Sequence, residues 1–428
     1  MTTIGWILVL ASVPPAQEMP KPGVSSEEKR LATLPPGTAV DRFAFSADGS
    51  SIAYVTKSMK SSCVVVGEKK GADFDEVNSL AISPDGKSVA YQARKGRKWH
   101  VLLNDEQGEE FDAVQSLTFS PDGKSIAYEA RSGTRWRAVH GTKKGETYDM
   151  AGRLLFSPDS RTVAYLVKNG NRECIVVGER EGKEYDEVYW RTLRFTPDGK
   201  DVTYVARDRN KCRVVTGEKE GEAWDGFHEP SIVLSPDCKT LAYRTYTRSG
   251  KWCVVVGNKR GEEFDGIAPD SLIFSPDGKT VAYVTLFNYV LAPNHFQPRS
   301  HFLVVGDKKI KELNNERFEG VSHFTFSPDG KTFAYLLRDG IKTTLVVGDR
   351  KTDPAELFET GPLAFSPDGK TIAYPARVRS GQWTVLAGAS SSAPFAAVTN
   401  PVFSPDGRKV AFGARTEREF LWKVLDVR

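Results

Sequence analysis

Short apolar stretches alternate with polar turns along almost the whole chain. In residues 116–130 the alternating stretch SLTF leads into the polar turn Ser120-Pro121-Asp122-Gly123, and the apolar stretch SIAYEA follows it. Alternation over such short lengths, bounded by Pro and Gly, is the pattern of half-buried β-strands joined by tight turns. The pattern therefore predicts an all-β protein.

The turn sequence Ser-Pro-Asp-Gly-Lys recurs, with small variations, in ten copies. Proline presets φ at the second position of a tight turn, and glycine takes the left-handed residue that follows, so each copy predicts a hairpin. Successive copies are 37 to 40 residues apart, except for one interval of 52 residues. The aspartates of the ten copies are Asp48, Asp85, Asp122, Asp159, Asp198, Asp237, Asp277, Asp329, Asp368 and Asp406.

Each repeat predicts four short strands, which we call A to D. In the third copy they span residues 116–119, 125–130, 136–140 and 146–148. Four antiparallel strands in about 40 residues is the size of a propeller blade, and radial stacking buries both faces of each blade against its neighbours. The sequence thus predicts a β-propeller of ten four-stranded blades in one ring. Two five-bladed propellers are the alternative, although nothing like a linker separates the fifth and sixth copies.

The two ends of the repeat region favour closure of a single ring. Residues 420–427 match strand C of the last blade and leave it without a strand D. Residues 29–34, which precede the first blade, could supply that missing outer strand. We therefore expect the beginning and the end of the chain to share one blade.

The repeated pattern Ser-Pro-Asp-Gly-Lys-x-[Ile/Val]-Ala-Tyr, seen for example in residues 120–128, resembles the WD-like repeats of the TolB propeller. It is also similar to the propeller domains of prolyl oligopeptidases and of the tricorn protease. The resemblance covers about residues 40–428 and implies the fold rather than a function, since these families share blades and differ in chemistry. The N-terminal α/β domain of TolB has no counterpart here, so a role in the Tol system does not follow.

The first residues predict an export signal. Residues 4–13 (IGWILVLASV) form a short apolar run, and cleavage after Ala16 is plausible, although no Lys or Arg precedes the run. The expected organisation is a signal peptide over residues 1–16, a polar linker over 17–28 and the propeller over 29–428. The expected location is periplasmic or extracellular, with the cytoplasm as the alternative if residues 1–16 are not a signal.

Charge and cysteine content exclude several classes of partner. The chain has 59 Lys and Arg against 55 Asp and Glu, a net charge of +4, and the two signs alternate along the sequence. That distribution does not predict a nucleic-acid partner. No apolar run approaches the roughly 20 residues of a membrane-spanning helix. Five cysteines, an odd number in a long chain, do not predict a disulfide framework.

An aromatic residue followed by an acid ends strand D in most repeats, and a basic residue lies three positions after the strand B aromatic. Because hairpins alternate ends in a four-stranded meander, both positions lie on one face of the disc. We expect a ring of charge-assisted hydrogen bonds that ties the blades together, with the aromatic residue between blades. The acids are Asp75, Asp112, Asp149, Asp186, Asp225, Asp265, Glu319 and Glu359, and the bases are Lys57, Arg94, Arg131, Lys168, Arg207, Arg338, Arg377 and Arg415.

The repeat pattern is interrupted in blades five to seven, so a structural role shared by all blades does not account for the residues there. The stretch from the strand D acid to the next turn lengthens from 8 to 10 residues, and an insertion covers residues 286–300 in the B–C loop of blade seven. We expect an aromatic-rich binding patch here, because exposed aromatic clusters tend to mark partner surfaces. The alternative is that the insertion only plugs the channel mouth. The candidate residues are Tyr189, Trp190, Phe227, His228, Tyr246, Phe287, Tyr289, His295 and Phe296.

Signals for catalysis are weak. The chain has no G-x-S-x-G and no H-E-x-x-H motif, and we predict no catalytic residue, metal ligand or cofactor. The expected function is a non-catalytic, exported scaffold that binds a protein or envelope ligand through blades five to seven. The alternative is a propeller enzyme of the lyase, lactonase or glycosidase type, with His228, Glu229 and the histidines of the insertion gathered at the channel mouth. The sequence predicts no oligomeric state.

Overall fold

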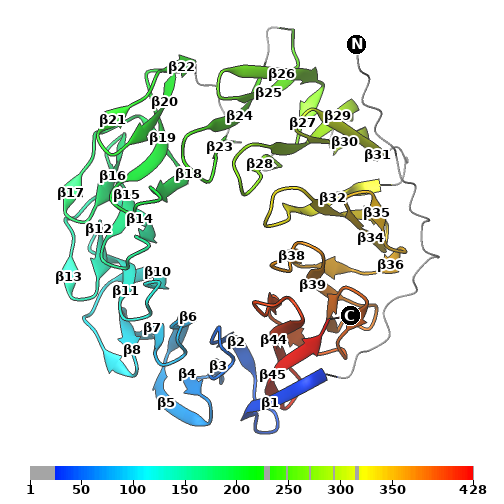
Figure 1. The fold of residues 1–428 in the computed structure, drawn as a ribbon. Coiled ribbons are helices and arrows are strands. Elements are labelled where there is room, and N and C mark those ends of the chain that lie inside the picture. Colours follow the sequence, from blue (N-terminus) through cyan, green and yellow to red (C-terminus); the bar gives the residue numbers. More distant parts are fainter. Residues whose placement is uncertain are drawn as a thin grey trace, which may run out of the picture.

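Ten antiparallel sheets form one closed ring around a central channel (Figure 1). This computed structural model describes residues 25–225, 232–246, 249–268, 271–292, 295–313 and 318–427. Every regular element in these ranges is a strand. No described helix is long and apolar enough to cross a membrane. The predicted fold, a single ten-bladed propeller, is confirmed, and the arrangement as two five-bladed propellers is wrong.

The first five blades follow one another along the chain, each with strand A next to the channel (Figure 1). Blade one contains β2 (Val40–Phe45), β3 (Ile52–Lys57), β4 (Ser62–Val66) and β5 (Lys69–Phe74). Blade two contains β6 (Glu76–Ile82), β7 (Val89–Lys95), β8 (Lys98–Leu103) and β9 (Glu106–Gln107). Blade three contains β10 (Ala113–Phe119), β11 (Ile126–Ser132), β12 (Arg135–His140) and β13 (Lys143–Lys144). Blade four contains β14 (Met150–Phe156), β15 (Val163–Asn169), β16 (Arg172–Val177) and β17 (Arg180–Glu181). Blade five contains β18 (Glu187–Phe195), β19 (Val202–Asp208), β20 (Lys211–Thr216), β21 (Lys219–Glu220) and β22 (Trp224–Asp225).

Blades six to nine repeat the arrangement, in some cases with strand A or D split into two short pieces. Blade six contains β23 (Ile232–Leu234), β24 (Leu241–Tyr246), β25 (Trp252–Val256) and β26 (Lys259–Phe264). Blade seven contains β27 (Gly266–Ile267), β28 (Ile273–Phe274), β29 (Val281–Ala292), β30 (His295–Val305) and β31 (Lys308–Leu313). Blade eight contains β32 (Phe318–Phe326), β33 (Phe333–Asp339), β34 (Lys342–Val347), β35 (Arg350–Lys351) and β36 (Ala355–Glu356). Blade nine contains β37 (Glu359–Thr360), β38 (Ala364–Phe365), β39 (Ile372–Arg377), β40 (Trp383–Ala387) and β41 (Ser390–Ser391).

The tenth blade joins the two ends of the chain, as predicted. It contains β42 (Ala397–Val398), β43 (Val402–Phe403), β44 (Lys409–Arg415) and β45 (Glu419–Asp426), and β1 (Ser25–Thr33) pairs antiparallel with β45 as the outermost strand. Residues 25–28 are therefore part of a strand and not of the linker, since their backbone pairs with the end of β45. The remaining residues of the expected signal peptide and linker lie outside the described residues.

The repeated turn holds strands A and B together through a small hydrogen-bond network. In blade three, Ser120 Oγ donates to Asp122 Oδ1 over 2.6 Å and accepts the N–H of Ser125 over 3.0 Å. Asp122 Oδ1 also accepts the N–H of Lys124 over 3.1 Å, and Gly123 has the left-handed φ of 72°. The hairpin expected from the turn sequence is thus present, and its Asp and Ser side chains add contacts that the backbone alone would not make.

Apolar residues of adjacent blades form the core between them. Ala127 and Ala138 of blade three pack in one buried cluster with Ala151 and Tyr165 of blade four. The small residues let neighbouring sheets approach, while the Tyr ring fills the space between them. Burying a large apolar side chain stabilises a fold by about 1.5–3 kcal/mol, so each blade depends on both of its neighbours.

The strand D acids tie successive blades together, although their main partners differ from those expected. Asp112 accepts the N–H of Gly133 in the B–C turn of the next blade over 2.7 Å and pairs with Lys98 on strand C of its own blade over 2.8 Å. These partners, Lys98 first, lower the pKa of Asp112. The strand B base Arg94 instead lies 3.2 Å from Glu76 and 4.0 Å from Asp75. Acid and base do share one face, which we call the loop face.

Candidate functional site

The two extra residues that lead into blade five form a wide bulge in its innermost strand. Pairing of β18 with β19 runs to Tyr189 and resumes only at Arg194. The buried hydroxyl of Thr192 donates to the carbonyl of Tyr189 over 2.6 Å and accepts the N–H of Val205 over 2.8 Å. These bonds replace the missing ladder bonds and fix the bulge, so the lengthened interval seen in the sequence is an ordered feature.

Blade seven contains the same kind of bulge, fixed by a hydroxyl side chain. Ser271 Oγ donates to the carbonyl of Ala268 over 2.8 Å and accepts the N–H of Val284 over 3.1 Å. Ser271 lies six positions after the strand D acid Asp265, just as Thr192 lies six positions after Asp186 in blade five. A hydroxyl residue at this position of a lengthened interval is therefore a sequence signal for this bulge.

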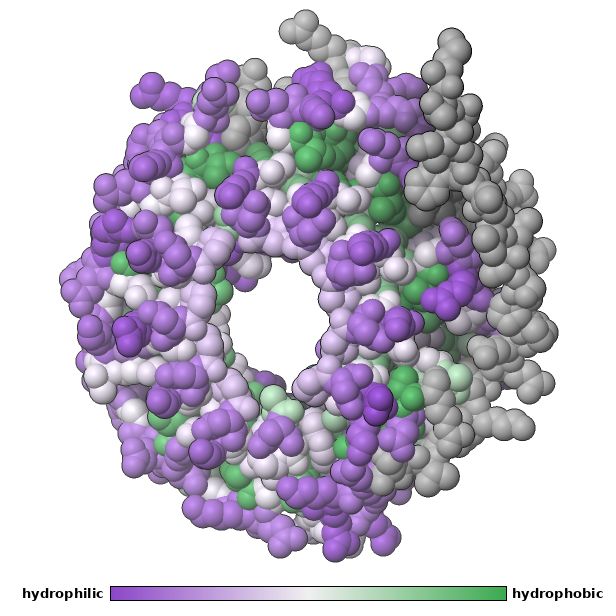
Figure 2. Space-filling view, viewed as in Figure 1, coloured by the Kyte–Doolittle hydropathy of each residue, from purple (hydrophilic) through white to green (hydrophobic). Residues whose placement is uncertain are grey.

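The bulge in blade five presents Trp190 to solvent beside two arginines. Trp190 is 37% exposed, the guanidinium carbon of Arg153 lies 4.0 Å from its ring centroid, and that of Arg191 lies 5.7 Å away. Arg153 belongs to β14, the innermost strand of blade four, and β18 is the innermost strand of blade five. We call Trp190, Arg153 and Arg191 the Trp190 cluster. It lies on the strands next to the channel, which is open in Figure 2.

Arg153 is held in an unfavourable backbone conformation by a buried carboxylate. Its φ is 62°, a left-handed value that costs a non-glycine residue about 1 kcal/mol or more. Glu129 on β11 is only 2% exposed and accepts the N–H of Arg153 over 2.9 Å. Burial raises the pKa of Glu129, while hydrogen bonds from Ser116, Gln115 and Arg153 act against that rise. The backbone beneath the Trp190 cluster is therefore fixed by blade three.

Two other predicted site residues are described with their side chains, and only one is accessible. Tyr189 is buried in a core cluster, with its hydroxyl 3.9 Å from the sulfur of Cys212, so it belongs to the packing between blades rather than to the surface. Burial raises its pKa. Tyr246, at the end of β24, is 50% exposed and packs edge-to-face on Trp252 with 5.3 Å between the ring centroids.

The insertion in blade seven is largely strand and not loop. It lengthens β29 and β30 into a hairpin in which Phe287 pairs with Ser300, Tyr289 with Pro298 and Leu291 with Phe296, up to the pair of Ala292 with His295. The structure describes only the backbone of this hairpin, so the side chains of Phe287, Tyr289, His295 and Phe296 lie outside the description. Phe227 and His228 lie outside the described residues altogether.

Blades eight and nine form a cavity of about 220 Å³ that the sequence did not indicate. His323, Arg338 and Glu359 line it together with the buried Thr343 and Leu357. Desolvation lowers the pKa of His323. Arg338 donates to the carbonyls of Gly340 and Phe358. His323 lies at the bulge of its inner strand, with a φ of 49°.

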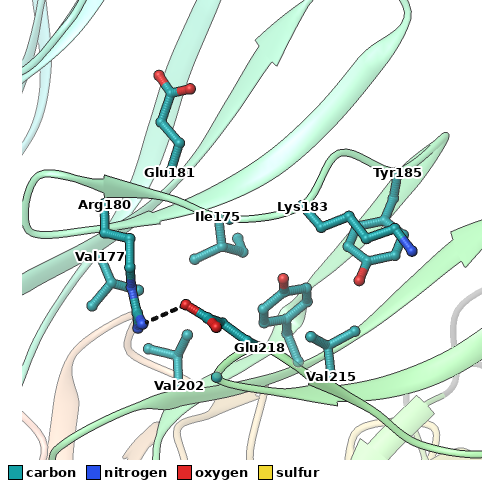
Figure 3. Close-up of a pocket in the computed structure, with 12 residues that line it drawn as sticks. Ile175, Val177, Arg180, Glu181, Lys183, Tyr185, Val202, Val215 and Glu218 are labelled. Atoms are coloured by element: carbon teal, nitrogen blue, oxygen red, sulfur yellow. Dashed lines mark hydrogen bonds and ion pairs between the residues drawn. The ribbon is translucent and has the colours of Figure 1, made fainter.

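A larger cavity of about 290 Å³ lies between blades four and five, and it too was missed (Figure 3). Its walls include Ile175 and Val177 from β16, Val202 and Tyr204 from β19, and Val215 from β20. Every one of these residues occupies a regular repeat position, so the sequence pattern marks them as architecture only. We call this space the inter-blade cavity.

The described part of the chain shows neither a metal-binding cluster nor an activated cysteine. No group of three or more His, Cys, Asp or Glu side chains there is placed to hold a metal ion. All five cysteines are free, and Cys63, Cys174, Cys212 and Cys253 are buried. Burial raises the pKa of the Cys174 thiol to about 11, which keeps it protonated and unreactive at neutral pH.

Comparison with known proteins gives no family. No protein-family model and no curated protein sequence matches the chain. Among solved structures, a eukaryotic initiation factor is similar with a TM-score of 0.46 and 14% identity, over 85% of this chain and 89% of that one. Kuenenia stuttgartiensis hydrazine synthase has a TM-score of 0.36 and 17% identity, over 63% of this chain and 94% of that one. Dihydro-heme d1 dehydrogenase NirN in complex with DHE has a TM-score of 0.37 and 15% identity, over 80% of this chain and 81% of that one. At such identities the likeness concerns the fold alone.

Proposed function

We propose that this protein is a binding scaffold, a TolB-like propeller with WD-like repeats that is exported and holds a protein or envelope ligand through blades five to seven. The observation that carries the proposal is the Trp190 cluster. A large aromatic ring stays 37% exposed while an arginine from the neighbouring blade stacks on it at 4.0 Å. Trp and Arg are the residues that most often dominate binding energy, and a ring already held in place loses little entropy on binding.

The surroundings of the Trp190 cluster support the same proposal. The bulge is fixed by Thr192, and the backbone of Arg153 is fixed by Glu129, so both anchors sit on rigid strands rather than on loops. The half-exposed Tyr246 and the long hairpin of β29 and β30 belong to the two blades that follow. Together they supply aromatic residues in the sector where the repeat breaks down.

A capture experiment tests this function. The mature protein is immobilised, exposed to an envelope extract of the source organism, and the retained proteins are quantified by mass spectrometry. We expect Trp190→Ala to reduce capture of a specific partner at least tenfold, while Phe358→Ala, which removes another exposed aromatic of the loop face, leaves it unchanged. Equal capture by wild type and Trp190→Ala would refute the proposal.

Export is tested separately. We expect the mature protein in the periplasmic or culture fraction, with a mass that corresponds to cleavage after Ala16. Intact protein confined to the cytoplasm would contradict this part of the proposal and leave the binding function open.

The enzyme alternative has one observation in its favour, the cavity that brings His323 and Glu359 together in blades eight and nine. A histidine with a lowered pKa beside a carboxylate can act as a general base. Metal analysis of the purified protein, paired with thermal melts with and without EDTA, distinguishes a metal-dependent enzyme from the scaffold. A stoichiometric metal and a melt lowered by EDTA would favour an enzyme, and a metal-free protein indifferent to EDTA would favour the scaffold.

A further inference from the structure

The inter-blade cavity opens at the end of the blades opposite the loop face. Arg180 at the start of β17 and the C–D turn residues Gly217 and Glu218 line it together with the strands of blades four and five. It is therefore separate from the Trp190 cluster and from the cavity around His323. Its volume of about 290 Å³ is close to the lower end of the range found for small-molecule sites, so it has room for a molecule built on a single ring.

The deep part of the cavity is lined by apolar side chains together with the hydroxyl of Tyr204, and charged residues line the rest. Ile175, Val202 and Val215 are each at most 2% exposed. Tyr204 is also 2% exposed, and among the described residues none forms a hydrogen bond with its hydroxyl. Burial is the main cause that raises the pKa of Tyr204, to about 12, so its hydroxyl remains a hydrogen-bond donor at neutral pH. The hydroxyl is accessible from the cavity, so an incoming acceptor would replace the water that otherwise accepts its proton.

The charges around the opening neutralise one another. Arg180 pairs with Asp201 over 2.9 Å and with Glu218 over 3.1 Å, and Figure 3 shows Glu218 directed towards Arg180. Lys183 pairs with Glu220 over 2.7 Å, and Glu220 also binds Arg213. Three cations thus face three anions.

The fourth acid of the rim, Glu181, points away from the cavity in Figure 3 and accepts the hydroxyl proton of Tyr148 on blade three. The hydroxyl does not neutralise this carboxylate, but its charge is directed out of the cavity. A rim of this kind offers a net attraction to neither an anion nor a cation.

From this geometry we propose that the inter-blade cavity binds a small uncharged molecule with one ring and a hydrogen-bond acceptor such as a carbonyl oxygen. The ring lies against Ile175, Val202 and Val215, and the acceptor takes the proton of the Tyr204 hydroxyl. The site does not depend on the scaffold function or on its partner.

The repeat itself supplies variants that should fold. Phe412 of blade ten occupies the repeat position of Tyr204, so Tyr204→Phe removes the hydroxyl with a side chain that another blade accepts. His140 of blade three occupies the position of Val177 and packs on Phe156 with 5.2 Å between ring centroids. Val177→His therefore fills the cavity with a side chain that the neighbouring blade already accommodates. Tyr165→Phe makes the same hydroxyl deletion in the adjacent groove and serves as the control.

The test is a titration of the mature protein with small aromatic probes, in which saturation-transfer NMR measures the binding of each probe. Acetophenone is the neutral probe, and benzoate and benzylammonium are its charged counterparts. We expect acetophenone to bind at one saturable site and the charged probes to bind at least tenfold more weakly. Tyr204→Phe should weaken acetophenone binding about five- to tenfold, the loss of one hydrogen bond, and Val177→His should abolish it. Tyr165→Phe should match the wild type.

Three results would overturn the proposal. The first is an absence of saturable acetophenone binding to the wild type. The second is acetophenone binding to Val177→His as tight as to the wild type, which would place the molecule elsewhere. Tighter binding of benzoate or benzylammonium would refute the uncharged class of ligand. None of these results bears on the capture experiment with Trp190→Ala, so the two proposals fail independently.

Discussion

At the scale of single residues, the left-handed position of the repeated turn has a measurable cost. Glycine occupies it in most copies, but Ser160 has a φ of 65° there and Cys238 a φ of 60°. A side chain in this conformation costs roughly 1–2 kcal/mol, of which part is offset because glycine is more flexible in the unfolded chain. Both side chains interact with the preceding blade, and the Cys238 thiol does so with the side chain of Thr203. Ser160 Oγ accepts the N–H of Asp122 from the preceding blade over 3.0 Å.

We therefore expect Cys238→Gly to stabilise the protein by about 1 kcal/mol, because it relieves the strained backbone. Ser160→Gly should gain less, since it also loses the hydrogen bond to Asp122. Thermal melts of the two variants against the wild type measure the difference. A lower melting temperature for Cys238→Gly would show that its side chain contributes more than its backbone costs.

Glu129 predicts a second residue-scale effect, which depends on pH. Because burial raises its pKa in the folded protein, the folded state binds this proton more tightly than the unfolded chain does. The resulting stability is present at pH values below the unfolded pKa of about 4.3 and is lost as the pH rises through the raised folded pKa. Gln92 occupies the same repeat position in blade two, so an amide fits there, with its nitrogen buried and without a hydrogen-bond partner.

We expect Glu129→Gln to melt close to the wild type at pH 4 and a few degrees above it at pH 8. Melts of both proteins across this range measure the gap. A gap that stays constant with pH would mean that Glu129 is not the titrating group.

At the scale of elements, the ring closes through an aromatic seam between blades ten and one. Phe43, Phe45 and Phe420 form a cluster with ring centroids 5.3–6.0 Å apart, and Gly413 on β44 lets Phe45 approach. A Cβ added at Gly413 would lie 2.4 Å from the ring of Phe45. The seam thus depends on one missing methyl group as much as on the aromatic rings.

Gly413→Ala should therefore destabilise the protein by about 1–3 kcal/mol, the usual cost of overpacking a core. Gly221→Ala is a suitable control, because its nearest neighbour would be a carbonyl oxygen at 3.3 Å and not an aromatic ring. Chemical denaturation of both variants gives the comparison. Equal midpoints for the two alanine variants would show that the seam can yield to the extra methyl group.

The strand β1 predicts a second effect at this scale. Ala32 is 2% exposed within it and packs near Phe420, whereas the side chain of Arg30 is 65% exposed. Ala32→Asp buries an unpaired charge and should detach β1, which would leave the edge of β45 open to other chains.

We expect Ala32→Asp to lower the melting temperature and to elute as aggregates or dimers in size-exclusion chromatography. Arg30→Ala, which removes only an exposed ion pair, should remain like the wild type. A monomeric Ala32→Asp variant with an unchanged melting temperature would show that β1 contributes little to closure.

At the scale of the whole molecule, the fold could be predicted because one signal is repeated ten times. The ring, the blade number and the pairing of β1 with β45 all follow from spacing and from what the last blade lacks. The site could be predicted only in part. Tyr189 and Trp190 are adjacent aromatic residues in one lengthened interval, and which of them faces solvent is decided by the hydrogen bonds of Thr192 across the bulge. The inter-blade cavity depends on the distance between the sheets of two blades, and that distance cannot be predicted from the sequence of a single repeat.

The ten turns also predict how the molecule responds to acid. Nine of the turn aspartates accept a hydrogen bond from the serine two residues earlier, and Asp198 accepts one from Thr196; these bonds are the largest cause that lowers each pKa. A lowered folded pKa gives stability that is present above the unfolded value of about 3.9 and is lost as the pH falls towards the folded values. We expect the melting temperature to fall steeply below pH 4. A melting temperature unchanged at pH 3 would show that the turns contribute little.

The pairing of β1 with β45 sets the order in which the protein can be completed in the cell. Glu28 and Lys423 form an ion pair across this junction although 395 positions separate them in the chain. β1 leaves the ribosome before the other described strands, and it cannot pair until β45 has been synthesised. Contacts so distant in sequence form slowly, because closing a long loop lowers the entropy of the chain before the new contact can stabilise it. During that wait β1 is an unpaired strand, and a chaperone that shields it would protect the protein more than one acting on any later strand.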